Sequence, residues 1–279
     1  MIHTSRQLKA LIRNKSQGDN AKATTLIRNF VMERLLERIS LSVYSDKLIL
    51  KGGLLIASMV GLDNRATMDM DTTVQNYNLS SDDAKKMIED IIAIPLDDGI
   101  QFVIKSVNNI MDEAEYPGIR LKLDARLDTM TTPLKIDIST DDVITPKEVD
   151  YEYRLMFEER SIPVLAYNLE TILAEKLETI LSRGVLNTRM RDYYDLMILS
   201  IVKAEEINYA DLTKALEATS RKRKSYELLE DSDHILKQIK SDTGLMAQWE
   251  IYQRKYDYAA DYYWQDIVKK IEQLFEKLM

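Results

Sequence analysis

The chain contains no cysteine and only two histidines, His3 and His234, in 279 residues. These absences exclude a disulfide-stapled fold, a thiol nucleophile, a zinc–thiolate centre and a site built from several histidines. Any metal ion that binds here must therefore be held by carboxylates.

Glycine and proline are also scarce, with eight and five residues respectively. Both counts lie well below the usual fractions of about 7% and 5%, which favours long helices over a turn-rich all-β fold. The longest apolar run, residues 54–62, is far shorter than the about 20 residues that cross a bilayer, and the N-terminus has no signal-peptide core. We expect a cytoplasmic protein without a membrane span.

Charge is distributed unevenly along the chain. The formal net charge is −8, yet residues 1–40 hold eight Lys and Arg against three acidic residues. Such a basic segment either contacts phosphate backbones or simply solvates a helix face, and both interpretations stay open.

The periodicity of apolar residues predicts an α+β part followed by a helical part. Helices are expected at 4–15 (capped by Thr4), 21–42 (capped by Asn20), 54–60, 80–95, 169–182, 189–203, 209–218, 226–240 and 261–278. Strands are expected at 48–50, 68–75, 100–107, 119–127 and 134–138. This pattern divides the chain into a domain at residues 1–165 and a helical domain at 166–279.

Two carboxylates mark the predicted strand 68–75. Asp69 and Asp71 alternate with Met68 and Met70, so both carboxylates leave one face about 7 Å apart at Cα while both methionines point into the core. That spacing suits a Mg²⁺ ion or a metal pair. Just upstream, Gly52–Gly53 separates a strand from a helix, and the backbone N–H groups and helix dipole there would bind a triphosphate.

A third carboxylate lies on the predicted strand 134–138. Leu134, Ile136 and Ile138 take the core face, which leaves Lys135 and Asp137 together on the other. Asp137 could complete a two-metal site, although the segment alone also fits an ordinary amphipathic strand.

The predicted helix 169–182 contains an anomaly at Lys176, which falls inside its apolar face. A lysine there either snorkels to solvent or points at an anion. On the next helix, Asp192 flanks the buried face while Asp195 lies toward the far side, so Asp192 is the stronger site candidate. An ion pair with Arg189 or Arg191 would explain Asp192 equally well.

Four motifs in this order resemble the AbiEii/AbiGii abortive-infection nucleotidyltransferases. The first is Lys51-Gly52-Gly53-Leu54-Leu55 followed by Arg65-x-Thr67-x-Asp69-x-Asp71, and the others are Lys135-Ile136-Asp137-Ile138, Ala174-Glu175-Lys176-Leu177 and Arg189-x-Arg191-Asp192-x-x-Asp195-Leu196. The resemblance runs from about residue 48 to 200. It implies a DNA-polymerase-β-like nucleotidyltransferase core, with a mixed sheet flanked by helices, joined to a C-terminal helical domain.

Carried over residue by residue, the resemblance makes Asp69 and Asp71 metal ligands, with Asp137 as a third. Mg²⁺ or Mn²⁺ would be the cofactor. Gly52, Gly53, Arg65 and Lys176 would bind the nucleotide, and Lys176 and Asp192 match the family's essential Lys and Asp. Many relatives carry Ser or Thr where this chain has Leu54, so a hydroxyl contact to phosphate is missing here.

The resemblance further implies a toxin of a type IV toxin–antitoxin system, whose antitoxin acts without a stable complex. Such toxins transfer NMP from an NTP to the 3′ end of tRNA and arrest growth. A small-molecule nucleotidyltransferase of the aminoglycoside-modifying type is the alternative. The sequence identifies neither the NTP, the tRNA species nor the oligomeric state, and it assigns no role to residues 200–279.

Overall fold

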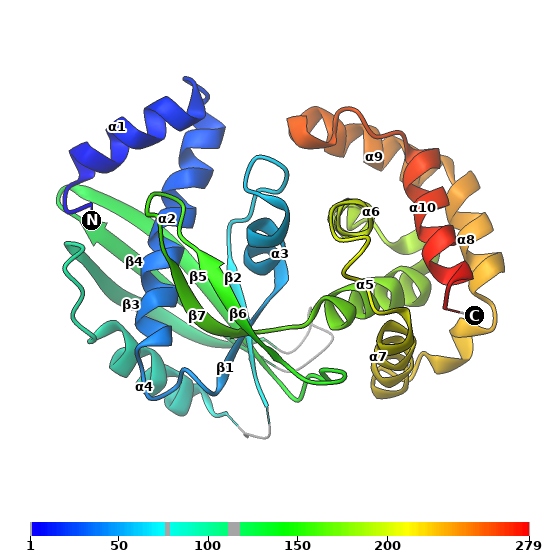
Figure 1. Cartoon of the computed structure of the whole chain (residues 1–279), viewed down its shortest axis with the longest axis horizontal. Helices are drawn as coiled ribbons and strands as arrows, with labels where there is room; N and C mark the ends of the chain where they lie inside the picture. The colour runs from blue at the N-terminus through cyan, green and yellow to red at the C-terminus, as the bar shows by residue number, and fades with distance from the viewer. Residues whose placement is uncertain (1, 76–78, 111–117, 279) are drawn as a thin grey trace. The chain divides into compact units, whose positions relative to one another are not determined.

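The structure, a computed structural model, describes residues 2–75, 79–110 and 118–278 and divides into two compact units (Figure 1). Unit 1 comprises Met1–Met59, Ala66–Asp142 and Val149–Ala166, and unit 2 comprises Val60–Arg65, Val143–Glu148 and Tyr167–Met279. The division at 165/166 expected from the sequence differs in two respects. Ala166 still belongs to unit 1, and the short segments 60–65 and 143–148 belong to unit 2 although they precede that boundary.

Unit 1 holds the strands and the N-terminal helices. They are α1 (Ser5–Ser16), α2 (Asn20–Ser40), β1 (Leu48–Lys51), α3 (Gly52–Val60), β2 (Met70–Val74), α4 (Ser81–Ile92), β3 (Ile100–Ile110), β4 (Gly118–Leu127), β5 (Met130–Thr140), β6 (Val149–Arg154) and β7 (Ser161–Ala166). The strands form one seven-stranded sheet in the order β3-β4-β5-β2-β1-β7-β6. Because β2 pairs with β5 and β1 with β7 in parallel and the other pairs are antiparallel, the sheet is mixed, as predicted.

The alternation of residues along the central strands gives this sheet one apolar and one polar face. On β5, Leu134, Ile136 and Ile138 are buried, while Lys135 and Asp137 lie on the opposite face, as their spacing predicted. Helix α2 packs against β5 and β7, and α4 packs against β3 and β4. These helices close the core, and the charged face carries the candidate site.

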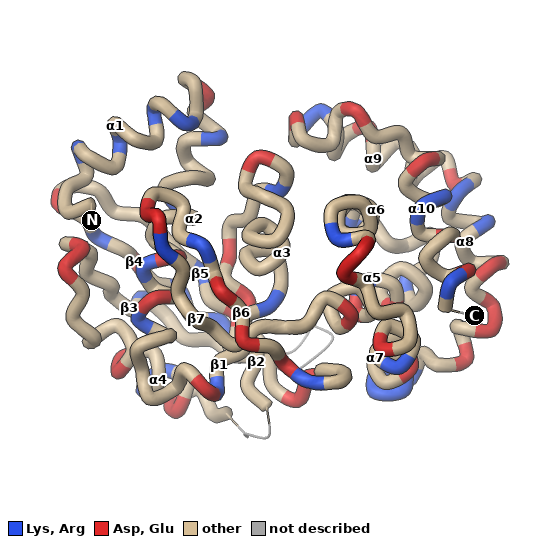
Figure 2. Tube along the Cα trace, in the orientation of Figure 1, with Lys and Arg blue, Asp and Glu red and all other residues tan. Residues whose placement is uncertain are grey.

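Helix α2 is buried around most of its surface, including charged residues. Arg38 makes two hydrogen bonds to Asp98, at 2.7 and 2.9 Å, and Arg34 contacts Glu158 at 2.9 Å. The expected basic surface of residues 1–40 is therefore confined largely to α1, where Lys and Arg positions follow one another along the tube (Figure 2). The cap of α2 is Asp19 and not Asn20, because the Asp19 side chain accepts the N–H groups of Ala21 and Lys22.

The sheet differs from the expected one in two unpredicted strands and in the start of β2. Strands β6 and β7 were not predicted, because β6 is a largely exposed edge strand and Pro163 interrupts the pattern of β7. Strand β2 begins only at Met70, so alternation does not reach Met68, which is 37% exposed and not in the core.

Unit 2 is helical. It contains α5 (Leu169–Arg183), α6 (Met190–Val202), α7 (Tyr209–Lys222), α8 (Ser232–Ser241), α9 (Thr243–Lys255) and α10 (Trp264–Glu276), with short 3₁₀ turns at Gly184–Leu186, Tyr226–Leu229 and Asp257–Ala259. Helix α9 was not predicted, and the expected helix 226–240 is a 3₁₀ turn followed by α8. Helix α6 contacts α5, α9 and α10, which buries it on almost every side.

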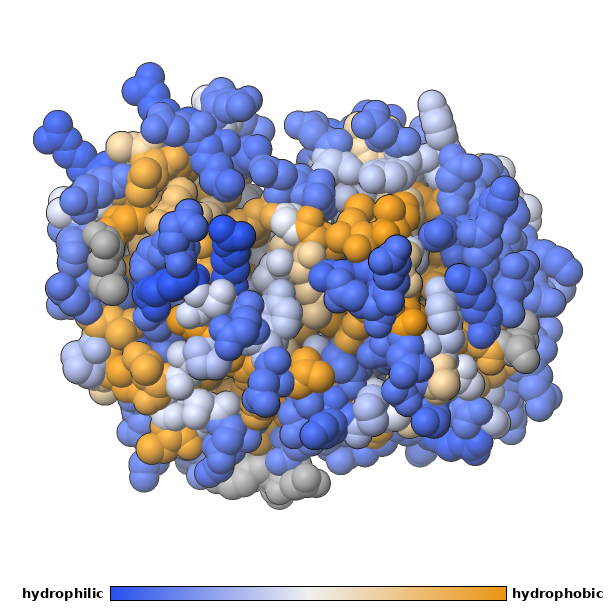
Figure 3. Space-filling model, viewed as in Figure 1, coloured by the Kyte–Doolittle hydropathy of each residue, from blue (hydrophilic) through white to orange (hydrophobic). Residues whose placement is uncertain are grey.

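Hydrophobic and hydrophilic side chains are interspersed on the visible surface (Figure 3). Most of the large apolar side chains are in the two cores, although some, such as Leu186 and Val43, are exposed. None of the described helices is long and apolar enough to cross a membrane.

Candidate active site

Strand register places four charged residues in a row across the polar face of the unit 1 sheet. Lys51 of β1 pairs with Asp71 of β2, Asp71 with Asp137 of β5, and Asp137 with Arg120 of β4. Residues directly opposite on neighbouring strands share a face, so two carboxylates stand side by side between two cations. The structure thus brings Asp71 and Asp137 together, as the sequence predicted from their separate strands.

Asp71 packs against Gly52, where β1 gives way to α3. Gly52 has φ of +69°, and a Cβ built on it would lie 2.1 Å from Oδ2 of Asp71. The residue must therefore be glycine both for its backbone conformation and for the space that Asp71 occupies. This contact fixes the first turn of α3, which contains Gly53, beside the carboxylate.

The electrostatics at Asp71 reflect this crowding. Loss of solvation raises the pKa of Asp71, and the carboxylates of Asp137 and Asp69 raise it further, while Lys51 and Lys135 oppose the shift. Negative charge is thus concentrated at one point of the sheet, an environment that favours a bound cation or a proton.

Asp69 precedes β2 and is one-third exposed. Its Oδ2 lies 2.8 Å from Nζ of Lys135, which also approaches Oδ2 of Asp137 at 3.7 Å. Asp137 in turn accepts two hydrogen bonds from Arg120, at 2.8 and 2.9 Å. Each of these carboxylates is therefore held by a cation of the same sheet.

The expected metal ion would be held by Asp69, Asp71 and Asp137. The carboxylate oxygens of Asp69 and Asp71 are donors that Mg²⁺ and Mn²⁺ prefer, and the raised pKa of Asp71 fits a place where a cation would relieve repulsion. Within the described ranges, however, no group of three or more His, Asp or Glu side chains is gathered to hold a metal ion. Both carboxylate oxygens of Asp137 accept hydrogen bonds from Arg120, so the role of Asp137 as a third metal ligand stays a prediction.

Lys51, the first residue of this row, and Asp142, which lies beside the row, had no assigned role in the sequence. The amine of Lys51 forms an ion pair with the fully buried carboxylate of Asp142, which also accepts a hydrogen bond from Ser139 at 2.8 Å. Lys51 directly precedes Gly52, so this pair anchors the end of β1. Asp142 lies 91 residues further along the chain, and no local pattern connects the two.

In unit 2, Lys176 of α5 is held between two carboxylates of α6. Its Nζ lies 2.8 Å from Oδ1 of Asp192 and 2.8 Å from Oδ2 of Asp195. Burial alone would lower the pKa of Lys176, but the two carboxylates outweigh it and raise the pKa. Lys176 therefore points at carboxylates of unit 2 and does not snorkel to solvent. A contact between Lys176 and a bound anion stays a prediction.

Asp195 is the residue that the sequence misplaced. It was expected on the far side of its helix, but its side chain is fully buried, and Nη2 of Arg65 donates to its Oδ2 at 3.1 Å. Burial would raise the pKa of Asp195, yet Arg65 and Lys176 lower it to about 2. The helical-wheel prediction failed because Arg65, which is 130 positions away in the sequence, covers Asp195, although Arg191 one turn earlier on the same side of α6 is exposed.

Arg65 was expected to bind the nucleotide. Its guanidinium is only 1% exposed, and its contact to Asp195 bridges 130 positions of sequence. In this arrangement Arg65 positions Asp195, and through it Lys176. A direct contact between Arg65 and a nucleotide stays a prediction.

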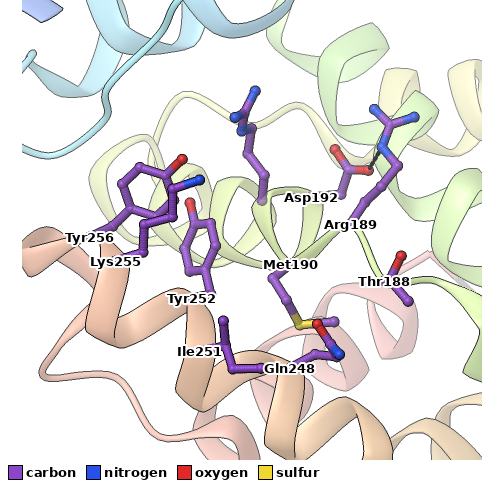
Figure 4. A pocket seen from close by; sticks show the side chains of 10 residues that line it. Thr188, Arg189, Met190, Asp192, Gln248, Ile251, Tyr252, Lys255 and Tyr256 are labelled. Carbon is purple, nitrogen blue, oxygen red and sulfur yellow. Dashed lines mark ion pairs between the residues drawn. The ribbon is translucent and has the colours of Figure 1, made fainter.

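Asp192 borders a pocket of about 340 Å³ in unit 2 (Figure 4). Nε of Arg189 lies 2.9 Å from Oδ2 of Asp192, so the ion pair that would explain Asp192 without a site role is present. The site role of Asp192 stays a prediction. Across the pocket lie Tyr252 and Tyr256, whose ring centroids are 4.7 Å apart, with Nζ of Lys255 5.3 Å from the Tyr256 ring. Aromatic faces beside cations are typical of nucleotide-binding surfaces.

Solved structures of other proteins share the fold of this chain. At the level of fold, the chain resembles MenT4, a nucleotidyltransferase toxin from Mycobacterium tuberculosis, with a TM-score of 0.57 and 15% identity over 97% of this chain and 98% of that one. It also resembles JHP933 from Helicobacter pylori, with a TM-score of 0.50 and 16% identity over 91% of this chain and 94% of that one. A search of curated protein sequences gave no significant match.

The model of one protein family, described as nucleotidyl transferase AbiEii toxin of type IV toxin–antitoxin systems, matches residues 34–276. This match includes the charged row, the Lys176 network and the C-terminal helices, which the motifs had not reached. The resemblance inferred from the motifs is thereby confirmed. The chain belongs to the AbiEii family of nucleotidyltransferase toxins.

Proposed function

We propose that this toxin transfers NMP from an NTP to an RNA acceptor, the 3′ end of tRNA, and that the loss of functional tRNA arrests growth in abortive infection. The observation that carries the proposal is the row in which Asp71 packs on Gly52 and stands beside Asp137. Family membership supplies the nucleotide substrate and an antitoxin as partner.

The residues of unit 1 have the properties that the reaction needs at the nucleotide. Backbone N–H groups at Gly52 and Gly53, at the start of α3, would bind the triphosphate together with the helix dipole. Asp69 and Asp71 would hold Mg²⁺ or Mn²⁺, which neutralises charge that develops on the transferring phosphoryl group. Lys135 and Arg120 orient Asp69 and Asp137.

In unit 2, Lys176 and Asp192 form the proposed catalytic pair. Lys176 carries positive charge that would stabilise the leaving pyrophosphate. Asp192 either orients Lys176 or accepts the proton of the attacking hydroxyl. Arg65 and Asp195 hold this pair in place from the buried side, since Asp195 contacts both Arg65 and Lys176.

RNA is favoured over a small acceptor by charge. Helix α1 carries Arg6, Lys9, Arg13 and Lys15 without an acidic residue, a surface that attracts phosphates and repels a cationic amino-sugar. We propose that the antitoxin acts without a stable complex, which co-purification of the two proteins tests directly.

The experiment is incubation of the purified protein with each α-labelled NTP, total tRNA and Mg²⁺ or Mn²⁺. We expect label at the 3′ end of tRNA, and none after chelation of the metal with EDTA. Labelling of an amino-sugar but of no RNA, with all four NTPs and both metals, would show that the small-molecule alternative is correct.

A further inference from the structure

A second pocket of unit 1, with a volume of about 300 Å³, opens beside Asp69. Four cationic side chains line it, Arg28, Lys105, Lys122 and Lys135, against the two carboxylates of Asp69 and Asp124. The excess of positive charge predicts an anionic ligand.

The lysines of this pocket are not all neutralised within the protein. Lys135 pairs with Asp69, and the half-exposed Lys105 approaches Asp124 at 3.6 Å. Lys122 is exposed and has no ion-pair partner in the described part of the chain. It also stands directly opposite Lys135 in the antiparallel β4–β5 pair, and like charges in that position destabilise a sheet. An anion between the two would remove this repulsion.

Arg28 provides a second, independent observation. Its Nη1 contacts Sδ of Met68 at 3.3 Å, a weak acceptor for a guanidinium. Its Nε is buried and, among the residues that the structure describes, has no hydrogen-bond partner. A planar cation with an unused donor is suited to a phosphate oxygen.

The position of the pocket in the sheet indicates whether it binds a phosphate of the NTP or one of the acceptor. In the order β3-β4-β5-β2-β1, Lys105 and Lys122 lie on the β3–β4 side of Asp71, while Gly52 follows β1 on the opposite side. Phosphoryl transfer places the attacking and leaving oxygens roughly in line across the phosphorus. If the triphosphate binds at Gly52, the pocket lies on the side from which the acceptor approaches.

We propose that Arg28, Lys105 and Lys122 form a subsite that binds a backbone phosphate of the acceptor RNA near its 3′ end. This inference rests on the proposed function for the identity of the acceptor. It assigns the cations of the pocket to RNA and not to the NTP.

The test uses the full chain and two separate measurements. Binding of fluorescently labelled tRNA without NTP is followed by anisotropy across a salt series, and KM values for tRNA and for NTP come from label transfer. The variants are Lys122→Ala, Lys105→Ala/Lys122→Ala and the charge-preserving Lys122→Arg. Lys86→Ala, an exposed lysine of α4 outside the pocket, is the matched control.

We expect Lys122→Ala to weaken tRNA binding about threefold to fivefold at low salt and the double variant about tenfold or more. The salt slope should fall by about 0.7 for each phosphate that the variant no longer neutralises. KM for tRNA should rise in parallel while KM for NTP stays constant, and Lys122→Arg and Lys86→Ala should resemble the wild type.

Two results would overturn the inference. A raised KM for NTP with unchanged tRNA binding would assign the pocket to the donor triphosphate, and unchanged values for both would make these lysines ordinary surface residues. Failure of the proposed function is a different outcome: the wild type would then label no tRNA, while the anisotropy series would still show whether RNA binding depends on Lys122.

Discussion

Nζ of Lys176 lies 2.8 Å from Oδ1 of Asp192, and both side chains are largely withdrawn from solvent. A buried cation that is shared by two carboxylates is strongly constrained, because removal of one partner leaves charge uncompensated. This relationship makes Lys176 part of both the stability and the chemistry of unit 2.

Lys176→Met should therefore lower the melting temperature as well as abolish transfer. Loss of the amine leaves two buried carboxylates without one of their cations, although Asp195 still pairs with Arg65 and Asp192 still pairs with Arg189. Because these remaining pairs limit the loss, we expect the free energy of unfolding to fall by about 3 kcal/mol. Thermal or urea denaturation measures this change. Lys85→Met, at an exposed ion pair with Glu89, is the control and should shift stability by less than about 0.5 kcal/mol. An unchanged or raised melting temperature for Lys176→Met would contradict the described network.

Gly52→Ala should abolish transfer and destabilise unit 1. The added methyl group would meet Oδ2 of Asp71 at 2.1 Å, and alanine resists a φ of +69°. Gly18→Ala separates these two effects, because Gly18 also has positive φ, +90°, but faces open space. We expect Gly18→Ala to cost about 1 kcal/mol with transfer intact. Equal activity of the two variants would show that the contact with Asp71 is unimportant.

Burial raises the pKa of Glu33 on α2 from 4.5 to about 8, although the backbone N–H of Met156, Arg34 and Asn29 oppose the shift. Between these two pH values the unfolded chain loses this proton while the folded chain retains it. The free energy of unfolding should therefore fall as pH rises from 4.5 to 8, by about 5 kcal/mol at most from this group, and stay constant above.

Glu33→Gln removes the titration, so its stability relative to the wild type should increase across that interval and level off above pH 8. Urea denaturation at several pH values gives the difference curve. A flat curve for Glu33→Gln would show that Glu33 is ionised in the folded protein.

The sequence predicted those parts of the fold and site that depend on short-range patterns. Alternation correctly assigned Lys135 and Asp137 to the face opposite Ile136, and the interrupted apolar face correctly identified Lys176 as unusual. Both predictions rest on patterns of apolar residues that recur every two to four positions along the chain, which a single sequence is sufficient to show.

The remaining site residues depend on contacts between distant segments. Arg65 meets Asp195 across 130 positions and Lys51 meets Asp142 across 91, so no local spacing could connect them. Asp195 was misplaced because a helical wheel considers one helix alone and does not include Arg65, which covers Asp195 from a distant segment. Strand β7 was missed because Pro163 is unusual inside a sheet, where it is tolerated opposite Glu152 of an edge strand.

Lys9→Gln/Arg13→Gln/Lys15→Gln tests the surface of α1. If this helix contacts phosphates, the triple variant should bind tRNA more weakly and with a shallower salt dependence, while KM for NTP stays unchanged. Anisotropy with labelled tRNA measures the affinity. The same affinity and salt slope as the wild type would mean that these side chains only solvate α1.

Transfer of label from an α-labelled NTP to the 3′ end of tRNA by the wild type, Asp69→Asn and Asp71→Asn tests the central claim most directly. Both substitutions should abolish transfer without loss of stability, and Asp71→Asn should raise the melting temperature slightly, because it removes repulsion from Asp137 and Asp69. Undiminished labelling of tRNA by the Asp69→Asn/Asp71→Asn double variant would contradict the assignment of the site.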